Sequence, residues 1–375
     1  MTSLTFDEYR SHFTEAPGFL DFARWGPPSD LVARNAVTAL GVLSNDIPDV
    51  ESMRSYQDDA LSMAARMTGR SGPDSAVFTS STSAGLFQLA FALSGGPDAE
   101  LLVSPKEFPA NVYPWVRAAE RGGPRVTWLR TPDGRVTPDA VAAALTPSTA
   151  ALAVSAVDFR TGYRADLAGL REVLGERLLL LDGIQGFGAC DVDWSLCDAV
   201  VVGGQKWVRS SWGTGFISLA PRGQDRLGSG LSGFSGVENP TLYDDSLHET
   251  LTTAGRLAMT NPDLVAASCL AAALTLIDGI TVSAIDREIQ LRVEALLDVI
   301  ENLGGATIVP LAPGERSGIV SFRLPGATAE QIGGALAEVG VVASVRGDYV
   351  RLSPHATTPL SSTDAVDKAL RSLSH

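Results

Sequence analysis

The sequence predicts an α/β fold with a mostly parallel seven-stranded sheet, followed by a small α+β C-terminal domain. Seven short apolar runs alternate with stretches of helical or turn character. Runs such as Leu178–Leu181 lack polar alternation, which is typical of strands buried on both faces of a parallel sheet. Amphipathic segments between the runs indicate helices that cover the sheet. The predicted strands are Ala76–Thr79, Leu101–Ser104, Arg125–Leu129, Ala150–Ser155, Leu178–Leu181, Ala199–Val202 and Gly215–Leu219.

After about residue 260 the pattern changes from alternating strands and helices to two long helices and then shorter elements. We therefore predict an N-terminal segment (1–20), a large domain (21–262) and a small domain (263–375), the last of a usual domain size. The elements predicted in the small domain are helices Leu264–Ile280, Ser283–Leu303, Thr328–Val339 and 363–372, a strand Gly318–Leu324, and a hairpin of Val341–Val345 and Tyr349–Leu352 around Arg346-Gly347-Asp348.

Composition excludes several classes of function. The net charge of −14 disfavours nucleic acid or an anionic membrane as a partner. No long uncharged apolar stretch or signal-peptide pattern occurs, so we expect a cytoplasmic protein. The three cysteines (Cys190, Cys197, Cys269) and the four histidines have no metal-ligand or disulfide spacing, so no metal site is predicted.

Hydroxyl side chains directly follow the first predicted strand. Residues 79–83 are five consecutive Ser or Thr residues at the start of a predicted helix, Ala84–Leu93. Such a cluster can cap the helix, or it can hold a phosphate at the positive end of the helix dipole. Five hydroxyl residues exceed the need of one cap, which favours a phosphate site.

Asp182 and Lys206 follow two neighbouring predicted strands. Asp182 could bind a metal, cap a helix or pair with a buried cation, and the lack of other metal ligands favours the cation. Lys206 is one of only three lysines and follows two glycines that permit a tight turn. A lysine desolvated at a strand end can act as a nucleophile or Schiff-base donor. The alternative is an ordinary lysine after a strand.

The order of these groups along one sheet points to a cofactor. Phe108 follows the strand Leu101–Ser104 and could stack on a planar ring or belong to the core. Ligands of an open α/β sheet bind at the carboxyl ends of the strands. A phosphate loop, an aromatic ring, a carboxylate that protonates a pyridine nitrogen, and a lysine together predict pyridoxal 5′-phosphate (PLP).

With these residues, the chain resembles the class V aminotransferase family of fold-type I PLP-dependent transferases. That family includes cysteine desulfurases, kynureninases and isopenicillin N epimerase-like proteins. The resemblance implies that Lys206 forms the Schiff base, Asp182 pairs with the pyridine nitrogen, and Gln185 hydrogen-bonds the phenolic oxygen of the ring. Lys206 and Asp182 are thus the predicted catalytic residues.

The same resemblance assigns the remaining site residues. Its implications are that Ser81, Thr82, Ser83 and Gln205 bind the phosphate, Phe108 stacks on the ring, Asp158 replaces an amide residue near the cofactor, Thr260 reaches the phosphate of the neighbouring subunit in a homodimer, and Arg351 clamps the substrate carboxylate. For Arg351 the alternative is a surface arginine of the hairpin.

Two departures from the family pattern bear on the reaction. The common Ser-x-His-Lys is Gly203-Gly204-Gln205-Lys206 here, and no cysteine follows Cys269, so desulfuration by a protein thiol is disfavoured. We expect a PLP-dependent enzyme acting on an amino acid or amine, with transamination as the main prediction. The alternatives are a C–S lyase or kynureninase-like hydrolase, an epimerase, and a binding module without catalysis.

Overall fold

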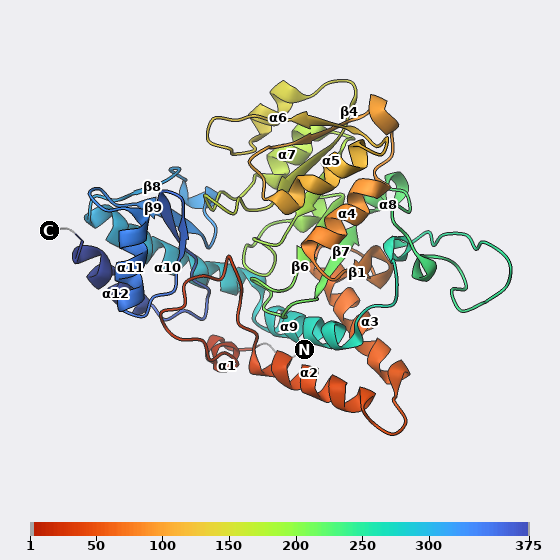
Figure 1. The fold of residues 1–375 in the computed structure, drawn as a ribbon, viewed down its shortest axis with the longest axis horizontal. Helices are drawn as coiled ribbons and strands as arrows, with labels where there is room; N and C mark the ends of the chain where they lie inside the picture. The colour runs from red at the N-terminus through yellow and green to blue at the C-terminus, as the bar shows by residue number, and fades with distance from the viewer. Residues whose placement is uncertain (1–3, 374–375) are drawn as a thin grey trace.

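The large sheet of the computed structural model, which describes residues 4–373, has the strand order β1-β7-β6-β5-β4-β2-β3. The C-terminal elements, drawn in blue, form a separate unit beside it (Figure 1). Strand β7 (Gly215–Leu219) runs antiparallel to both neighbours, β1 (Ala76–Phe78) and β6 (Ala199–Gly203), and the other four pairings are parallel. The predicted sheet is therefore confirmed. Its other strands are β2 (Glu100–Val103), β3 (Arg125–Trp128), β4 (Thr149–Ser155) and β5 (Leu178–Asp182).

Successive residues of the central strands pack into two different hydrophobic clusters. In β4, Leu152 belongs to the cluster that includes α7 (Leu167–Leu174), whereas Ala153 belongs to the one that includes α4 (Thr82–Ala92) and α5 (Tyr113–Ala119). Both faces of the sheet are therefore buried, which explains why the strand segments lack polar alternation. Two further helices of this region are α6 (Pro138–Ala144) and α8 (Pro221–Arg226).

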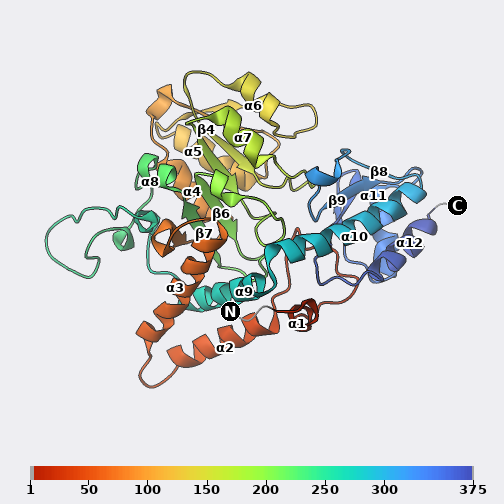
Figure 2. The same ribbon diagram turned by 180° about the vertical axis from the view of Figure 1, so that it is seen from behind.

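In the part of the chain that the structure describes, three α-helices precede the first strand, and they were not predicted from the sequence. They are α1 (Phe6–Ser11), α2 (Asp30–Leu43) and α3 (Val50–Met67). Helices α2 and α3 pack against α9 (Leu264–Ile280), whose residues are almost all buried (Figure 2). The domain boundary at residue 262 stays a prediction, but α9 itself packs on helices of the large domain.

The remainder of the C-terminal region forms a second, antiparallel sheet of order β10-β11-β9-β8. Residues 1–3 and 374–375, which belong to the predicted N-terminal segment and small domain, lie outside the described residues. The elements of this region are β8 (Ala306–Thr307), β9 (Val320–Arg323), β10 (Ser344–Arg346), β11 (Tyr349–Leu352), α10 (Val282–Asn302), α11 (Ala329–Glu338) and α12 (Ser362–Arg371).

An extended segment near the N-terminus joins the two regions. Leu20 donates its backbone N–H to Val342 (3.1 Å) and accepts from the N–H of Ser353 (2.7 Å). Farther along, the N–H of Gly26 donates to the carbonyl of Gln205 (2.9 Å), in the loop after β6. The segment therefore contacts both the small sheet and the carboxyl end of the large sheet.

Within residues 4–373, no single helix is both long and apolar enough to cross a membrane. Helices α9 and α10 reach the required length and apolar character only when they are taken together, and the chain bends by 80° at their junction.

Candidate active site

A cavity of about 300 Å³ lies where the strand ends of the large sheet face the small sheet. That volume is at the lower end of the range for small-molecule sites. Nine of its lining residues were predicted from the sequence: Ser81, Thr82, Ser83, Phe108, Asp182, Gln185, Gln205, Lys206 and, from β11, Arg351. The residues that sequence analysis missed are Ala23, Arg24, Ala110, Phe159, Ile184, Trp212 and Arg346.

Lys206 sits in a tightly held loop between β6 and β7. The N–H of Gly204 donates to the carbonyl of Thr214 (2.9 Å), and the hydroxyls of Ser210 and Thr214 are hydrogen-bonded (2.7 Å). A Cβ atom on Gly204 would lie 1.8 Å from Ser210 Oγ, so only glycine fits there. The loop therefore presents Lys206 to the cavity on a fixed backbone.

Burial moves the two predicted catalytic groups toward neutral pH. It raises the pKa of Asp182 to about 6, although the N–H of Ile184 donates to this carboxylate (3.0 Å) and Lys206 attracts it. Burial also lowers the pKa of Lys206 to about 8, against the attraction of Asp182. An amine whose pKa is near neutral can take up and release a proton. A carboxylate can keep a proton on a nitrogen that pairs with it.

The start of α4 forms a small polar cradle. Ser81 Oγ accepts from the N–H of Ala84 (3.1 Å), so Ser81 is the cap of the helix. Thr82 Oγ1, by contrast, is buried with no hydrogen-bond partner in the described chain. A Cβ on Gly203 would fall 2.7 Å from Thr82 Oγ1 and 2.8 Å from Gln205 Oε1. Glycine therefore keeps open the space between Thr82 and Gln205.

Phe108 lies against the lysine. The Nζ of Lys206 is 5.4 Å from the centroid of the Phe108 ring, and Phe159 meets that ring edge-on at 5.2 Å. Phe108 is 40% exposed, so it lines the cavity and is not a core residue. The preceding Glu107 accepts from the N–H of Ser155 (3.0 Å), and burial raises its pKa to about 7.

Gln185 is fixed by two hydrogen bonds. Its Nε2 donates to the carbonyl of Ala23 (2.9 Å), and its Oε1 accepts from the indole N–H of Trp207 (2.8 Å). An amide nitrogen carries two protons, so one N–H remains for a ligand in the cavity. That arrangement is compatible with the predicted hydrogen bond to a ring oxygen.

Arg351 is buried, with 1% of its surface exposed. Its guanidinium lies 3.3 Å from Asp21 Oδ1 and donates to the carbonyl of Phe159 (3.0 Å). The alternative of a surface hairpin arginine is therefore wrong. Its function as a carboxylate clamp stays a prediction, and its place in the cavity wall is consistent with it.

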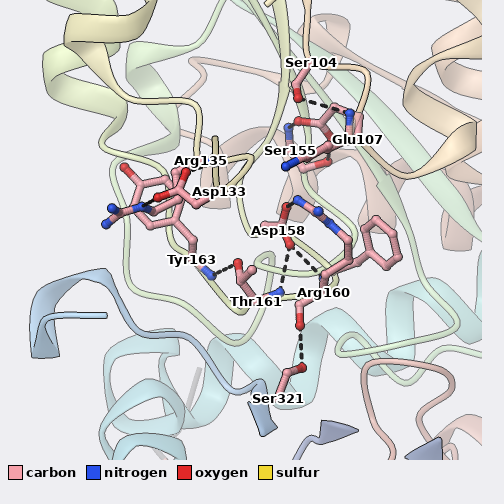
Figure 3. Close-up of polar contacts among 12 residues, drawn as sticks. Ser104, Glu107, Asp133, Arg135, Ser155, Asp158, Arg160, Thr161, Tyr163 and Ser321 are labelled. Atoms are coloured by element: carbon pink, nitrogen blue, oxygen red, sulfur yellow. Dashed lines mark hydrogen bonds and ion pairs between the residues drawn. The ribbon is translucent and has the colours of Figure 1, made fainter. Parts of the chain in front are cut away.

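Asp158 does not line the cavity. Its carboxylate accepts from the N–H groups of Arg160 and Thr161 (both 2.8 Å) and pairs with the Arg160 guanidinium (2.6 Å). Figure 3 shows these contacts pointing into the 158–163 turn, separate from the Glu107–Ser155 pair. The structure thus gives Asp158 a local structural role, and its predicted contact with the cofactor finds no support in this geometry.

Thr260 lies apart from the other predicted residues. It is exposed and lines a different cavity, together with Phe78, Ser80 and Met259. Within one chain it does not meet Lys206. The predicted contact with a neighbouring subunit stays a prediction.

Comparison with known proteins identifies the class. The sequence model described as Aminotransferase class-V matches residues 56–372, so the chain belongs to that family. A probable cysteine desulfurase from Aeropyrum pernix is 29% identical over 342 residues, which cover 86% of this chain and 79% of that protein. Two solved structures share the fold at 18% identity and a TM-score of 0.84. One is a cysteine desulfurase from Thermococcus onnurineus, with 97% of each chain covered. The other is the cystine C–S lyase C-DES with cysteine persulfide, covering 95% of this chain and 97% of that one.

The predicted cofactor, PLP, is confirmed at the level of the family. The cavity also fits it, because Thr82 Oγ1 lacks a partner and Gly203 leaves room beside it. Lys206 would hold the aldehyde carbon, Asp182 the pyridine nitrogen, and Thr82 with Gln205 the phosphate. Phe108 would contact the ring.

Proposed function

We propose that the chain is a cytoplasmic, PLP-dependent lyase that cleaves the C–S bond of a cysteine-type α-amino acid. Transamination was our main prediction from the sequence, but the relatives named above are desulfurases and a C–S lyase, which favours the lyase alternative. The observation that carries the proposal is the cavity in which Lys206, with a pKa near 8, lies against Phe108 and close to Asp182.

The three cysteines, which all lie among residues 4–373, offer no accessible thiol for storing sulfur. Cys190, Cys197 and Cys269 are all buried. Burial raises the pKa of Cys190 and of Cys197 to about 12, so neither forms a thiolate at neutral pH. We therefore propose that the sulfur leaves with the product. Overall, RS–CH2–CH(NH3⁺)COO⁻ and water would give a thiol, pyruvate and ammonium.

Each predicted residue has a distinct task in this reaction. Bound PLP supplies an electron sink for negative charge at the substrate's Cα. Asp182 would keep the pyridine nitrogen protonated, and the Thr82 hydroxyl, which has no partner in the described chain, would hold the phosphate. Lys206 takes the α-proton and keeps it inside the cavity. Phe108 carries no ionisable group and cannot protonate the departing sulfur, so we assign that proton to Lys206, whose Nζ lies 5.4 Å from the Phe108 ring centroid.

The test is a product assay on the PLP-loaded protein with cysteine, cystine and S-alkylcysteines. We expect equal amounts of thiol (or sulfide) and pyruvate, borohydride fixation of the cofactor at Lys206, and a loss of activity of more than about 10³-fold in Lys206→Ala. Accumulation of the pyridoxamine form without thiol release would contradict the lyase and support transamination.

We further propose a homodimer with shared sites. The support is that Thr260 is exposed and follows a segment with exposed apolar side chains, namely Leu242, Tyr243 and Met259, which a second copy of the chain would cover. Sedimentation should give twice the mass of the chain.

A further inference from the structure

A second arginine of the small sheet, Arg346, faces the cavity beside Arg351. In the antiparallel pairing of β10 and β11, Ser344 lies opposite Arg351, and Arg346 lies opposite Tyr349. Residues opposite one another, or two apart along a strand, share a face of the sheet. Arg346 and Arg351 therefore project from the same face. Both guanidinium groups also lie close enough to Lys206 for their positive charges to lower its pKa.

The charges of the two arginines are compensated differently. Arg351 has a buried counter-ion in Asp21, whose carboxylate also accepts from the hydroxyl of Ser344 (2.8 Å). Arg346, in contrast, has no carboxylate within ion-pair distance among residues 4–373. The Nε atoms of both arginines are buried without a hydrogen-bond partner, so Arg346 lacks both a counter-ion and a partner for this donor. A buried donor left unsatisfied is costly unless a ligand satisfies it.

The cavity thus holds more positive charge than one α-carboxylate requires. Asp182 would pair with the pyridine nitrogen of bound PLP, and Thr82 with Gln205 would hold its phosphate. A third arginine, Arg24, also lines the cavity but is exposed, so its charge is screened by solvent. Arg346 is left as a half-buried cation without a partner, next to the group predicted to bind the substrate.

We propose that Arg346 binds a second anionic group, carried on the sulfur substituent of the substrate. This inference rests on the proposed function, and it names the substrate class as cysteine S-conjugates whose substituent bears a carboxylate or another acid. Arg351 takes the α-carboxylate, while the Arg346 guanidinium donates charge-assisted hydrogen bonds to the distal anion.

The test compares two S-conjugates that differ in one charge, S-carboxymethylcysteine and S-methylcysteine, with the PLP-loaded enzyme. We expect the acidic conjugate to have a KM about 10- to 100-fold lower. The variant Arg346→Met should abolish this preference, raising the KM of S-carboxymethylcysteine far more than that of S-methylcysteine. Arg323→Met is the matched control, since Arg323 is on the same sheet but pairs with Asp348 and is half exposed.

Two results would overturn the inference. One is equal affinity of the wild type for both conjugates. The other is an equal loss for both in Arg346→Met, which would mean that the two arginines share one carboxylate.

Binding is measured separately from turnover by calorimetry on the PLP-loaded Lys206→Ala variant. If the acidic conjugate binds more tightly there but neither conjugate releases thiol from the wild type, the proposed lyase function fails and the anion site stands. If thiol is released without any preference, the anion site fails and the lyase stands.

Discussion

The two walls of the cavity differ in the kind of charge that they carry. The wall formed by the large sheet holds two groups that burial has moved toward neutral pH, Asp182 and Lys206, with pKa values of about 6 and 8. Behind this wall, burial likewise raises the pKa of Glu107 to about 7. The wall formed by the small sheet holds Arg346 and Arg351, and burial lowers the pKa of Arg351 only to about 10, so it keeps its charge. One wall is suited to moving protons and the other to holding anions.

The sharpest test of this division is Asp182→Asn. The amide cannot hold the proton on the pyridine nitrogen, so kcat should fall by about 10²-fold, while KM for the substrate changes little. Steady-state kinetics on the PLP-loaded variant measure both constants. Asp46→Asn, in the exposed α2–α3 connection, is the control. If KM rose by the same factor by which kcat fell, the two walls of the cavity would not have separate roles in catalysis and in substrate binding.

The next test concerns the pH dependence of folding. Because the pKa of Glu107 is raised above its unfolded value, the stability that its protonated form contributes is complete below about pH 4.5 and is lost as the pH rises through about 7. Glu107→Gln should remove this slope, which is worth roughly 3 kcal/mol for a shift from 4.5 to about 7. Urea unfolding of the cofactor-free protein at several pH values measures it. An unchanged slope would mean that the carboxyl titrates normally.

The smallest expected effect is that of Arg351→Lys. The ammonium retains a charge near Asp21 but loses the planar fork, so the KM of the substrate should rise about 10-fold at a nearly constant kcat. Arg323→Lys on the same sheet should change neither. A fall in kcat without a change in KM would mean that Arg351 takes part in the proton-transfer chemistry assigned to the large sheet and not in substrate binding.

The wall of the large sheet could be predicted because its residues follow buried strands directly. Parallel strands bring their carboxyl ends to one edge, so Asp182 and Lys206 had to meet once the strands were recognised. The predicted bounds of β7 and α9 agree with those observed. Helix α2 was missed, since exposed apolar residues such as Val37 and Leu40 blur its amphipathic pattern.

The wall of the small sheet was predicted only in part. Arg351 was found through the family pattern, whereas Arg346 was assigned to the turn of the hairpin. The register of that hairpin could have revealed the position of Arg346. Arg346 comes two residues after Ser344 and therefore shares its face of the sheet, and Ser344 is the residue paired with Arg351. Nothing local to Asp21 or Ala23 predicts their contacts, because their partners lie far away in the sequence. Asp158 was predicted to lie near the cofactor because it stands where the family has an amide residue. Its carboxylate instead accepts hydrogen bonds from the backbone N–H groups of its own turn.

The pairing of the extended segment around residues 20–26 with the small sheet also sets the order in which the enzyme can be completed during synthesis. Asp21 meets Arg351 and Ser344 across separations of 330 and 323 positions. The ribosome must therefore make nearly the whole chain before the segment finds its place, and such long-range closure is slow. A nascent chain that has already folded its large sheet should stay inactive until its last hundred residues emerge, so premature termination yields no partly active enzyme.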